Sequence, residues 1–269
     1  MSLLKRLKAD SEIESRIMSA IRSGSPLGVI RLGDGEGLLL GWPEVRKNKR
    51  ANRALNYQLV KWFGLKNGSA HQKKQMRSIL RKAIQRANII GVPKPRKKGL
   101  WSFAHKQIAG SRLIKPSHVL TDTDIHVNLH RSGALYRAIL AAESVTIVTC
   151  RASVKPQLEA FTGKRVKLIQ IPEGRHVESG RATPKNTKHW ESRSQYRKAC
   201  HTAGTQLVLV GGGVLGKIYT TDASRGGAVA IDIGSLFDGW AKFGSRSHLR
   251  ADPDSFLLPE NREMTSSQD

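Results

Sequence analysis

Acidic residues, cysteines and long apolar runs are all scarce in this 269-residue chain. The two cysteines, Cys150 and Cys200, exclude a disulfide framework and lack the spacing of a zinc site, so we expect a reducing, cytoplasmic setting. No stretch approaches the roughly 20 apolar residues that a membrane-spanning helix needs. Residues 1–24 lack the uninterrupted apolar core of a secretion signal, so none is expected.

The scarcity of acids leaves a large positive charge, which is concentrated in one part of the chain. With 46 Lys and Arg against 21 Asp and Glu, the net charge is +25. Residues 43–116 contain 20 basic residues and a single acid, Glu44, whereas the chain from Ser117 onward contains 20 basic and 15 acidic residues. A long stretch of one sign attracts polyanions, such as DNA, RNA, an anionic membrane surface or an anionic glycan. Charge therefore indicates the class of partner and not its identity.

The apolar residues that are present predict an α/β protein. Short apolar segments, typical of strands covered by helices on both faces, lie at 27–32, 88–92, 145–150, 166–171, 206–210 and 228–233. Helical segments are predicted at 11–24, 52–65, 69–87, 124–141, 153–162, 187–203 and 214–225. This alternation predicts a Rossmann-like, mostly parallel sheet flanked by helices, with a basic helical insertion. We expect one domain over 1–250, strongly basic and largely helical at 43–116, and a mobile C-terminal tail at 251–269.

The first polar motif, RLGDGEG, follows the first predicted strand, at the edge of the sheet where α/β proteins bind ligands. Asp34 and Glu36 stand two residues apart between glycines, which suits Mg²⁺ or Mn²⁺ held together with phosphate oxygens. Arg31 could contact phosphate or hold a carboxylate, while Gly33 and Gly35 permit a tight turn. Taken alone, the string fits a methyltransferase loop or a plain glycine turn as well as it fits a metal or nucleotide site.

A second motif, GGGVLGK, follows a later strand and ends in Lys217. Strand, glycine loop and helix start come in the order that cradles phosphate, because backbone amides at a helix N-terminus point toward an anion. Phosphate or ribose binding is therefore favoured over a purely structural turn. Ile218 stands where a P-loop needs the Ser or Thr hydroxyl that holds Mg²⁺, which excludes an NTPase.

Two more motifs end in polar residues at strand ends. Asp232, in AIDIGS, could hydrogen-bond a ribose or sugar hydroxyl, or it could cap the next helix, as Ser235 could. His126, in TDTDIH, could be a general base or bind an acceptor; an N-cap by Asp122 or Asp124 beside a surface histidine fits slightly better. Further strand-end groups are Arg151, Glu173, Arg175 and His176, and in so basic a chain any one arginine is more often a solvated surface group.

Together, VIRLGDGEG, GGGVLGK and AIDIGS resemble the motifs of bacterial glycosyltransferases of the GT-D fold, a family long classed as a domain of unknown function. The resemblance spans roughly residues 10–245. It implies a Rossmann-like domain, a nucleotide-sugar donor (a UDP-sugar in the best-known branch) and Mn²⁺ or Mg²⁺. Asp34 and Glu36 match the D-x-E pair of the family, which acts at the metal and the donor. The residues that would line the donor site are Arg31, Gly33, Gly35, Gly213, Leu215, Gly216, Lys217 and Asp232.

The resemblance predicts a metal-dependent transfer of sugar to a glycan or lipid-linked acceptor at the cytoplasmic membrane face. The metal and Lys217 or Arg31 would neutralise the leaving diphosphate. Asp34, Glu36 or His126 could take the acceptor proton in an inverting reaction. The basic stretch and Lys217 depart from the family pattern. For the basic stretch, we favour attachment to an anionic membrane surface over binding of an anionic acceptor.

Two other functions are compatible with parts of the sequence. A SAM-dependent methyltransferase could use GDGEG, but Glu36 interrupts the usual G-x-G-x-G run, and positions 43–66 offer only Glu44 as a ribose-binding acid. A non-catalytic nucleic-acid or polyanion binder fits the charge. Aromatic residues make up only 6% of the chain, which is few for base stacking, and no helix-turn-helix or RNA-recognition signature is present. A nucleic-acid partner is therefore disfavoured.

Overall fold

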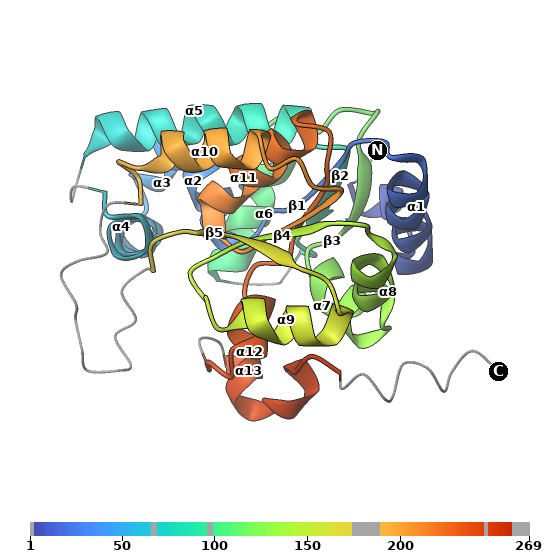
Figure 1. Ribbon diagram of the computed structural model, residues 1–269. Coiled ribbons are helices and arrows are strands. Elements are labelled where there is room, and N and C mark those ends of the chain that lie inside the picture. The colour runs from blue at the N-terminus through green and yellow to red at the C-terminus, as the bar shows by residue number, and fades with distance from the viewer. Residues whose placement is uncertain (1–2, 66–68, 96–98, 174–188, 245–246, 260–269) are drawn as a thin grey trace.

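The computed structural model describes residues 3–65, 69–95, 99–173, 189–244 and 247–259. Its centre is a seven-stranded sheet in which every pairing is parallel, with strand order β3-β2-β1-β7-β6-β4-β5 (Figure 1). The strands are β1 (Leu27–Arg31), β2 (Ile89–Val92), β3 (Val119–Asp122), β4 (Val145–Thr149), β5 (Val166–Gln170), β6 (Leu207–Val210) and β7 (Val229–Asp232). This arrangement confirms the predicted α/β sheet flanked by helices.

Helices cover both faces of the sheet and bury a hydrophobic cluster on each. The first face carries α2 (Asp34–Leu40), α3 (Trp42–Val45), α4 (Lys49–Phe63), α5 (Ala70–Arg86), α6 (Leu100–Gly110), α10 (Arg193–His201) and α11 (Gly213–Arg225). The second carries α1 (Asp10–Ser23), α7 (Ile125–Arg131), α8 (Ala134–Ala141), α9 (Val154–Thr162), α12 (Leu236–Trp240) and α13 (Ser247–Ala251). Short 3₁₀ turns lie at Leu3–Arg6 and Asp254–Phe256.

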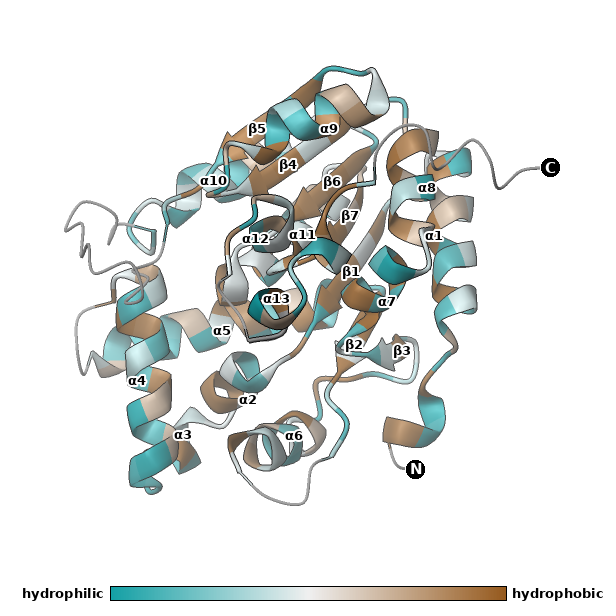
Figure 2. Cartoon of the chain, turned by 90° about the horizontal axis from the view of Figure 1, so that it is seen from below, coloured by the Kyte–Doolittle hydropathy of each residue, from teal (hydrophilic) through white to brown (hydrophobic). Residues whose placement is uncertain are grey.

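The inner strands are apolar on both faces because each face meets helices. In β6, Val208 and Val210 belong to one cluster, whereas Leu207 and Leu209 belong to the other. Side chains that alternate across a strand produce this division. Figure 2 shows most of the strand residues in the hydrophobic colours, between helices of mixed colour.

Three features of the chain differ from the predicted elements. The predicted helix at 124–141 is two helices, because Gly133 has a left-handed φ of 73° between α7 and α8. Strand β3 and helix α6 were not predicted. The predicted strand at 88–92, within the basic region 43–116, is present as β2 and pairs with β1 and β3.

Part of the predicted tail packs on the domain. Phe256 is 1% exposed, its ring stacks on His130 with 5.6 Å between the centroids, and Tyr136 donates a hydrogen bond to the Leu257 carbonyl. The packed domain therefore continues past residue 250, and residues 260–269 lie outside the described ranges. Across the described helices, none is both long and apolar enough to cross a membrane.

Candidate functional site

The carboxyl ends of neighbouring strands bring together residues that are far apart in the sequence. Arg31 is the last residue of β1, and Asp232 is the last residue of β7, the strand beside it. Lys217 reaches the same place from the second turn of α11. Glu36 arrives from the first turn of α2, directly after β1. These four residues, Arg31, Glu36, Lys217 and Asp232, form what we call the charge cluster.

Lys217 lies at the centre of the charge cluster. Its Nζ is 3.1 Å from Oε1 of Glu36 and 2.9 Å from Oδ2 of Asp232. Arg31 holds the other side of Asp232: its Nη2 is 3.4 Å from Oδ1, and its Nε donates to the Asp232 carbonyl at 2.9 Å. Two cations thus balance two carboxylates, as buried charges require.

Burial makes these ion pairs strong constraints on the site. Asp232 has no exposed surface, and Lys217 and Glu36 are 4% and 6% exposed. Burial alone raises the pKa of Asp232, but the charges of Arg31 and Lys217 outweigh it and hold the pKa below its usual value. Asp232 therefore stays ionised and orients the two cations. Because it is enclosed, it does not itself face a donor in this conformation.

The two carboxylates of the D-x-E pair have different surroundings. Oε2 of Glu36 accepts a hydrogen bond from the Gly33 amide at 2.8 Å, which caps α2, while Oε1 meets Lys217. Both of its oxygens are therefore engaged. Asp34 is half-buried; Oδ1 accepts from the Gly35 amide at 2.9 Å, and Oδ2 is 3.5 Å from the Gln58 amide. Asp34 is the more open of the two carboxylates.

The fit of this site to a divalent metal depends on Asp34. In the part of the chain that the structure describes, no three His, Cys, Asp or Glu side chains gather as a ligand set. Mg²⁺ is commonly held by one or two carboxylates together with substrate phosphates. Asp34 fits that arrangement, whereas ligation by Glu36 would require it to leave Lys217 or the Gly33 amide. The residues present thus suit a cation that arrives with a phosphate-bearing ligand.

Two glycines of the first motif serve helix packing. The predicted glycine loop is the first turn of α2, and a Cβ on Gly35 would lie 2.7 Å from the side chain of Gln58 on α4. A Cβ on Gly37 would lie 2.5 Å from Cβ of Ala104 on α6. The motif therefore packs α2 closely against two helices of the basic region, and this close packing positions Asp34 and Glu36.

Gly234 is a site residue that was not singled out from the sequence. It follows β7 with a left-handed φ of 52°, and a Cβ there would lie 2.0 Å from Nη2 of Arg31. The guanidinium therefore passes directly over this glycine. In the sequence, this contact is indicated by a glycine two residues after Asp232, the last residue of its strand.

His126 is buried, so the surface position favoured for it is wrong. It is 5% exposed, and both ring nitrogens lie 3.0 Å from Nη1 of Arg31. Asp122 accepts a hydrogen bond from the Asp124 amide at 3.1 Å, and it also pairs with Lys94. His126 thus supports Arg31 from the side opposite Asp232.

The GGGVLGK motif places a helix start beside the charge cluster. Helix α11 begins at Gly213, which is exposed and has a left-handed φ of 54°. The first amides of a helix are available to an anion. Leu215 is completely buried and Gly216 is buried as well, so these two predicted donor residues contribute packing. Only the Gly213 end of the motif is open to a ligand.

A second polar group lies beyond β4. Arg151 is not the solvated surface residue expected from composition: Nε is 2.7 Å from Oδ1 of Asp238, Nη1 pairs with Glu173, and the guanidinium lies 3.8 Å from the centroid of the Phe243 ring. Arg175 and His176, also noted in the sequence, lie outside the described residues.

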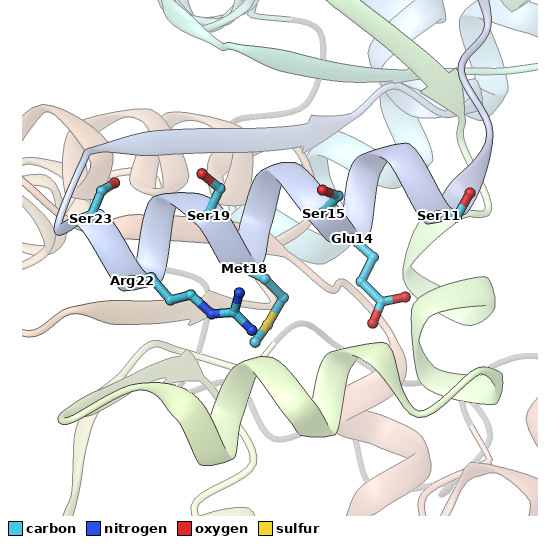
Figure 3. A pocket seen from close by; sticks show the side chains of 7 residues that line it. All are labelled: Ser11, Glu14, Ser15, Met18, Ser19, Arg22 and Ser23. Carbon is cyan, nitrogen blue, oxygen red and sulfur yellow. The ribbon is translucent and has the colours of Figure 1, made fainter.

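Two cavities lie outside the charge cluster. One, of about 610 Å³, runs along α1 and is lined mainly by serines, with Glu14, Met18 and Arg22 (Figure 3). Glu14 in it is bound by Arg137. The other, of about 300 Å³, lies between the starts of α4 and α6 and includes Arg50 and Lys106. Neither cavity contains a residue of the charge cluster.

Comparison with known proteins supports the resemblance seen in the motifs. A family model described as a GT-D fold-like domain matches residues 8–240. A solved structure of domain of unknown function 1792, in selenomethionine-substituted form, is 15% identical, with a TM-score of 0.47 over 84% of this chain and 82% of that one. A second, described as that domain with a distinct glycosyltransferase fold, is 13% identical, with a TM-score of 0.48 over the same shares, 84% and 82%. No curated protein matches.

Proposed function

This chain belongs to the GT-D-like family of glycosyltransferases, and we propose that it moves a sugar from a nucleotide-sugar to a glycan or lipid-linked acceptor. The observation that carries the proposal is the charge cluster at one edge of the sheet together with two open groups, the half-buried carboxylate of Asp34 and the exposed Gly213 at the start of α11. A diphosphate needs cationic partners and backbone amides, and both lie at this edge of the sheet. A UDP-sugar is the first donor to test.

Arg31 is the member of the charge cluster best placed to meet the donor. Its side chain is 13% exposed, compared with 5% for Lys217 and none for Asp232. Asp232 and His126 hold the guanidinium on two sides, so it is oriented before a ligand arrives. We assign to Arg31 the neutralisation of charge on the leaving diphosphate, because a fixed donor costs no reorganisation during reaction. Lys217 acts as a positioning residue.

Asp34 is the proposed ligand of Mn²⁺ or Mg²⁺. The metal, when bound, would supply further neutralisation of the diphosphate. The Gly35 amide orients one oxygen of Asp34, and Gln58 lies near the other. The proposed binding of the metal by Asp34 therefore depends on its second oxygen, Oδ2.

The three candidates for the base differ in access. Glu36 is engaged by Lys217 and the Gly33 amide, and His126 is buried against Arg31. Asp34 is half-buried and is the candidate with access to an acceptor hydroxyl. Asp34 could hold the metal or accept the proton. Comparison of Asp34→Asn with Asp34→Glu at several Mn²⁺ concentrations separates the two, because a lost ligand is partly restored by excess metal and a lost base is not.

The charge of the chain supports a proposal for the acceptor and the location. We place the enzyme in the cytoplasm, peripheral to the inner membrane face, where lipid-linked acceptors carry anionic groups. The strongly basic stretch at 43–116 supports this location, since a positive field concentrates the chain at an anionic surface.

The direct test is calorimetric titration of UDP, GDP, CDP and SAM, each with and without Mn²⁺. We expect one nucleoside diphosphate to bind, with at least tenfold weaker binding when Mn²⁺ is left out. Asp34→Asn should abolish transfer and remove the metal effect while the protein stays folded. Asp254→Asn, the same acid-to-amide change at an exposed position of the C-terminal segment, is the matched control and should behave as the wild type. Binding of SAM alone would replace the proposal with a methyltransferase, and full activity of Asp34→Asn would contradict the site assignment.

A further inference from the structure

Helices α5 and α10 lie on the same side of the sheet (Figure 1), and both are rich in basic residues. They are neighbours in space, because Arg86 of α5 and Arg197 of α10 both contact Asp222 of α11. We call the exposed surface of these two helices the α5–α10 face. Its basic residues are Lys74, Arg77, Arg81, Lys82, Arg86, Arg193, Arg197 and Lys198.

No acid on either helix offsets this charge, since neither α5 nor α10 contains Asp or Glu. The carboxylate beneath them, Asp222, is only 4% exposed and meets three arginines, Arg197 at 2.6 Å, Arg225 at 3.9 Å and Arg86 at 4.0 Å. One buried negative charge cannot neutralise three cations. The face therefore presents a surplus of positive charge to its surroundings.

Basic side chains on the face also repel one another. Burial, and then the charge of Arg81, lower the pKa of Arg77. Burial, and then the charge of Arg197, lower the pKa of Arg193. Like charges held this close destabilise the free protein, and an anionic surface placed against them would relieve the repulsion.

The residues between the cations favour one kind of anionic partner. On α5, the exposed uncharged positions between Lys74 and Arg86 are Gln75, Ser78 and Gln85. Tyr196 of α10 packs against Tyr219 and His189, so it offers no free ring. Single-stranded nucleic acid needs aromatic stacking surfaces, and an inserting amphipathic helix needs an apolar face. A surface of cations and uncharged polar groups fits electrostatic adsorption on lipid headgroups.

We propose that the α5–α10 face docks the enzyme on an anionic lipid surface. Helix α5, of 17 residues, spans about 25 Å, long enough to contact several headgroups. It joins β2 through a two-residue link and so runs antiparallel to the strands, with its first residues at the carboxyl edge of the sheet. Docking through this face leaves that edge, with Asp34 and Arg31, open beside the membrane. The inference rests on the proposed function for the membrane location and the lipid-linked acceptor, and it adds the surface that makes the contact.

The test measures sedimentation of the full chain with vesicles of phosphatidylcholine, with or without phosphatidylglycerol, at about 0.15 M salt. We expect binding to the anionic vesicles alone. The variant Lys74→Glu/Lys82→Glu should weaken it by at least about 30-fold, since each juxtamembrane basic residue contributes roughly fivefold in affinity. Lys5→Glu/Arg165→Glu changes the net charge equally, away from the face, and should lose less than about threefold by the same reasoning.

Three results would overturn the inference: no binding to anionic vesicles, an equal loss in both double variants, or binding of an RNA oligonucleotide that Lys74→Glu/Lys82→Glu abolishes while vesicles are ignored. The last result would assign the face to nucleic acid. Both double variants should retain metal-dependent binding of the nucleoside diphosphate. Failure at the vesicles with intact donor binding is therefore distinguishable from failure of the proposed function.

Discussion

Lys217 is a buried residue whose ion pairs hold the residues of the charge cluster in place. Its ammonium neutralises both Glu36 and Asp232, so it sets the position of α2 relative to β7. The sequence showed a lysine at the end of a glycine motif but no reason for it. Its partners are Glu36, in the first motif, and Asp232, in the third, and pairing between segments so far apart comes only from the order of the strands.

We expect Lys217→Met to lower the free energy of unfolding by about 3–5 kcal/mol, because it leaves two buried carboxylates with one cation. Urea denaturation followed by circular dichroism measures the change. Lys82→Met, which removes an exposed lysine, should change the free energy by less than about 0.5 kcal/mol. If the two variants proved equally stable, Lys217 would not be a structural cation.

His189 gives the protein a dependence on acid that can be worked out from its burial. It is 2% exposed, it is hydrogen-bonded through Nε2 to the Tyr219 hydroxyl at 2.9 Å, and burial lowers its pKa to about 4. In the unfolded chain the imidazole takes up a proton near pH 6.5. The unfolded state therefore binds more protons between pH 6.5 and 4, and stability falls as the pH falls through that window.

From pH 7 to pH 5 this histidine should cost the wild type about 2 kcal/mol of stability. His189→Gln keeps a polar group near Tyr219 but cannot take up a proton, so its loss over the same interval should be smaller by about that amount. Urea denaturation at the two pH values gives the comparison. A parallel decline in both proteins would mean that other groups cause the acid sensitivity.

At the scale of elements, the turns after β1 and β7 depend on each other. The Arg31 side chain crosses Gly234, and the Thr123 hydroxyl after β3 donates to the Leu32 carbonyl at 2.9 Å. These contacts join three strand ends into one support for the site. A change in the backbone of one turn should therefore displace a side chain from another strand.

Gly234→Ala tests this dependence against a control that the chain itself provides. Gly234 and Gly24 both have left-handed φ values, 52° and 66°, but a Cβ on Gly24 would meet nothing within 4 Å. Gly24→Ala should cost about 1 kcal/mol for backbone strain alone. Gly234→Ala should cost more, since it also displaces Arg31, and should weaken binding of the nucleoside diphosphate at least tenfold. Equal donor affinity in the two variants would show that Arg31 does not contact the donor.

The elements that could be predicted are those whose residues carry the signal locally. Strands such as β4 and β6 are runs of β-branched and aliphatic residues, and their apolar composition alone identifies them. Strand β3 reads VLTD and lies at the edge of the sheet, so half of it is polar and no apolar run reports it. Gly133 has no such signature either, because a single glycine is tolerated within a helix and only its φ reveals the break between α7 and α8.

At the scale of the whole molecule, the candidate site could be located but not assembled from the sequence. Parallel strands place their carboxyl ends at one edge, so Asp34, His126 and Asp232 were expected there together. Which of them face a ligand depends on burial, which the motifs do not encode. The motifs were therefore sufficient for the family and for the edge of the sheet at which these residues meet, whereas the difference in burial between Asp34 and Asp232 required the packed fold.

The extent of the domain is the last property that only the fold reveals. Residues after Arg250 are mostly polar and acidic, which suggests a tail, yet Phe256 closes the second face of the sheet. The Phe256 ring lies parallel to that of His130, within 5°. A Cβ placed on Gly239 would lie 2.8 Å from Cβ of Phe256. His130 also meets the Ser255 carbonyl at 2.8 Å through Nε2.

We therefore expect Phe256→Ala to lower the free energy of unfolding by about 3–5 kcal/mol, the cost of removing a fully buried aromatic side chain. Asp254→Ala, an exposed change two residues earlier, should alter it by less than about 0.5 kcal/mol. Thermal and urea denaturation of the full chain measure both. If Phe256→Ala were as stable as Asp254→Ala, the segment would be a tail after all and the domain would end near residue 250. If the predicted loss is found, the domain of this glycosyltransferase extends through the segment that packs on α7 and α12.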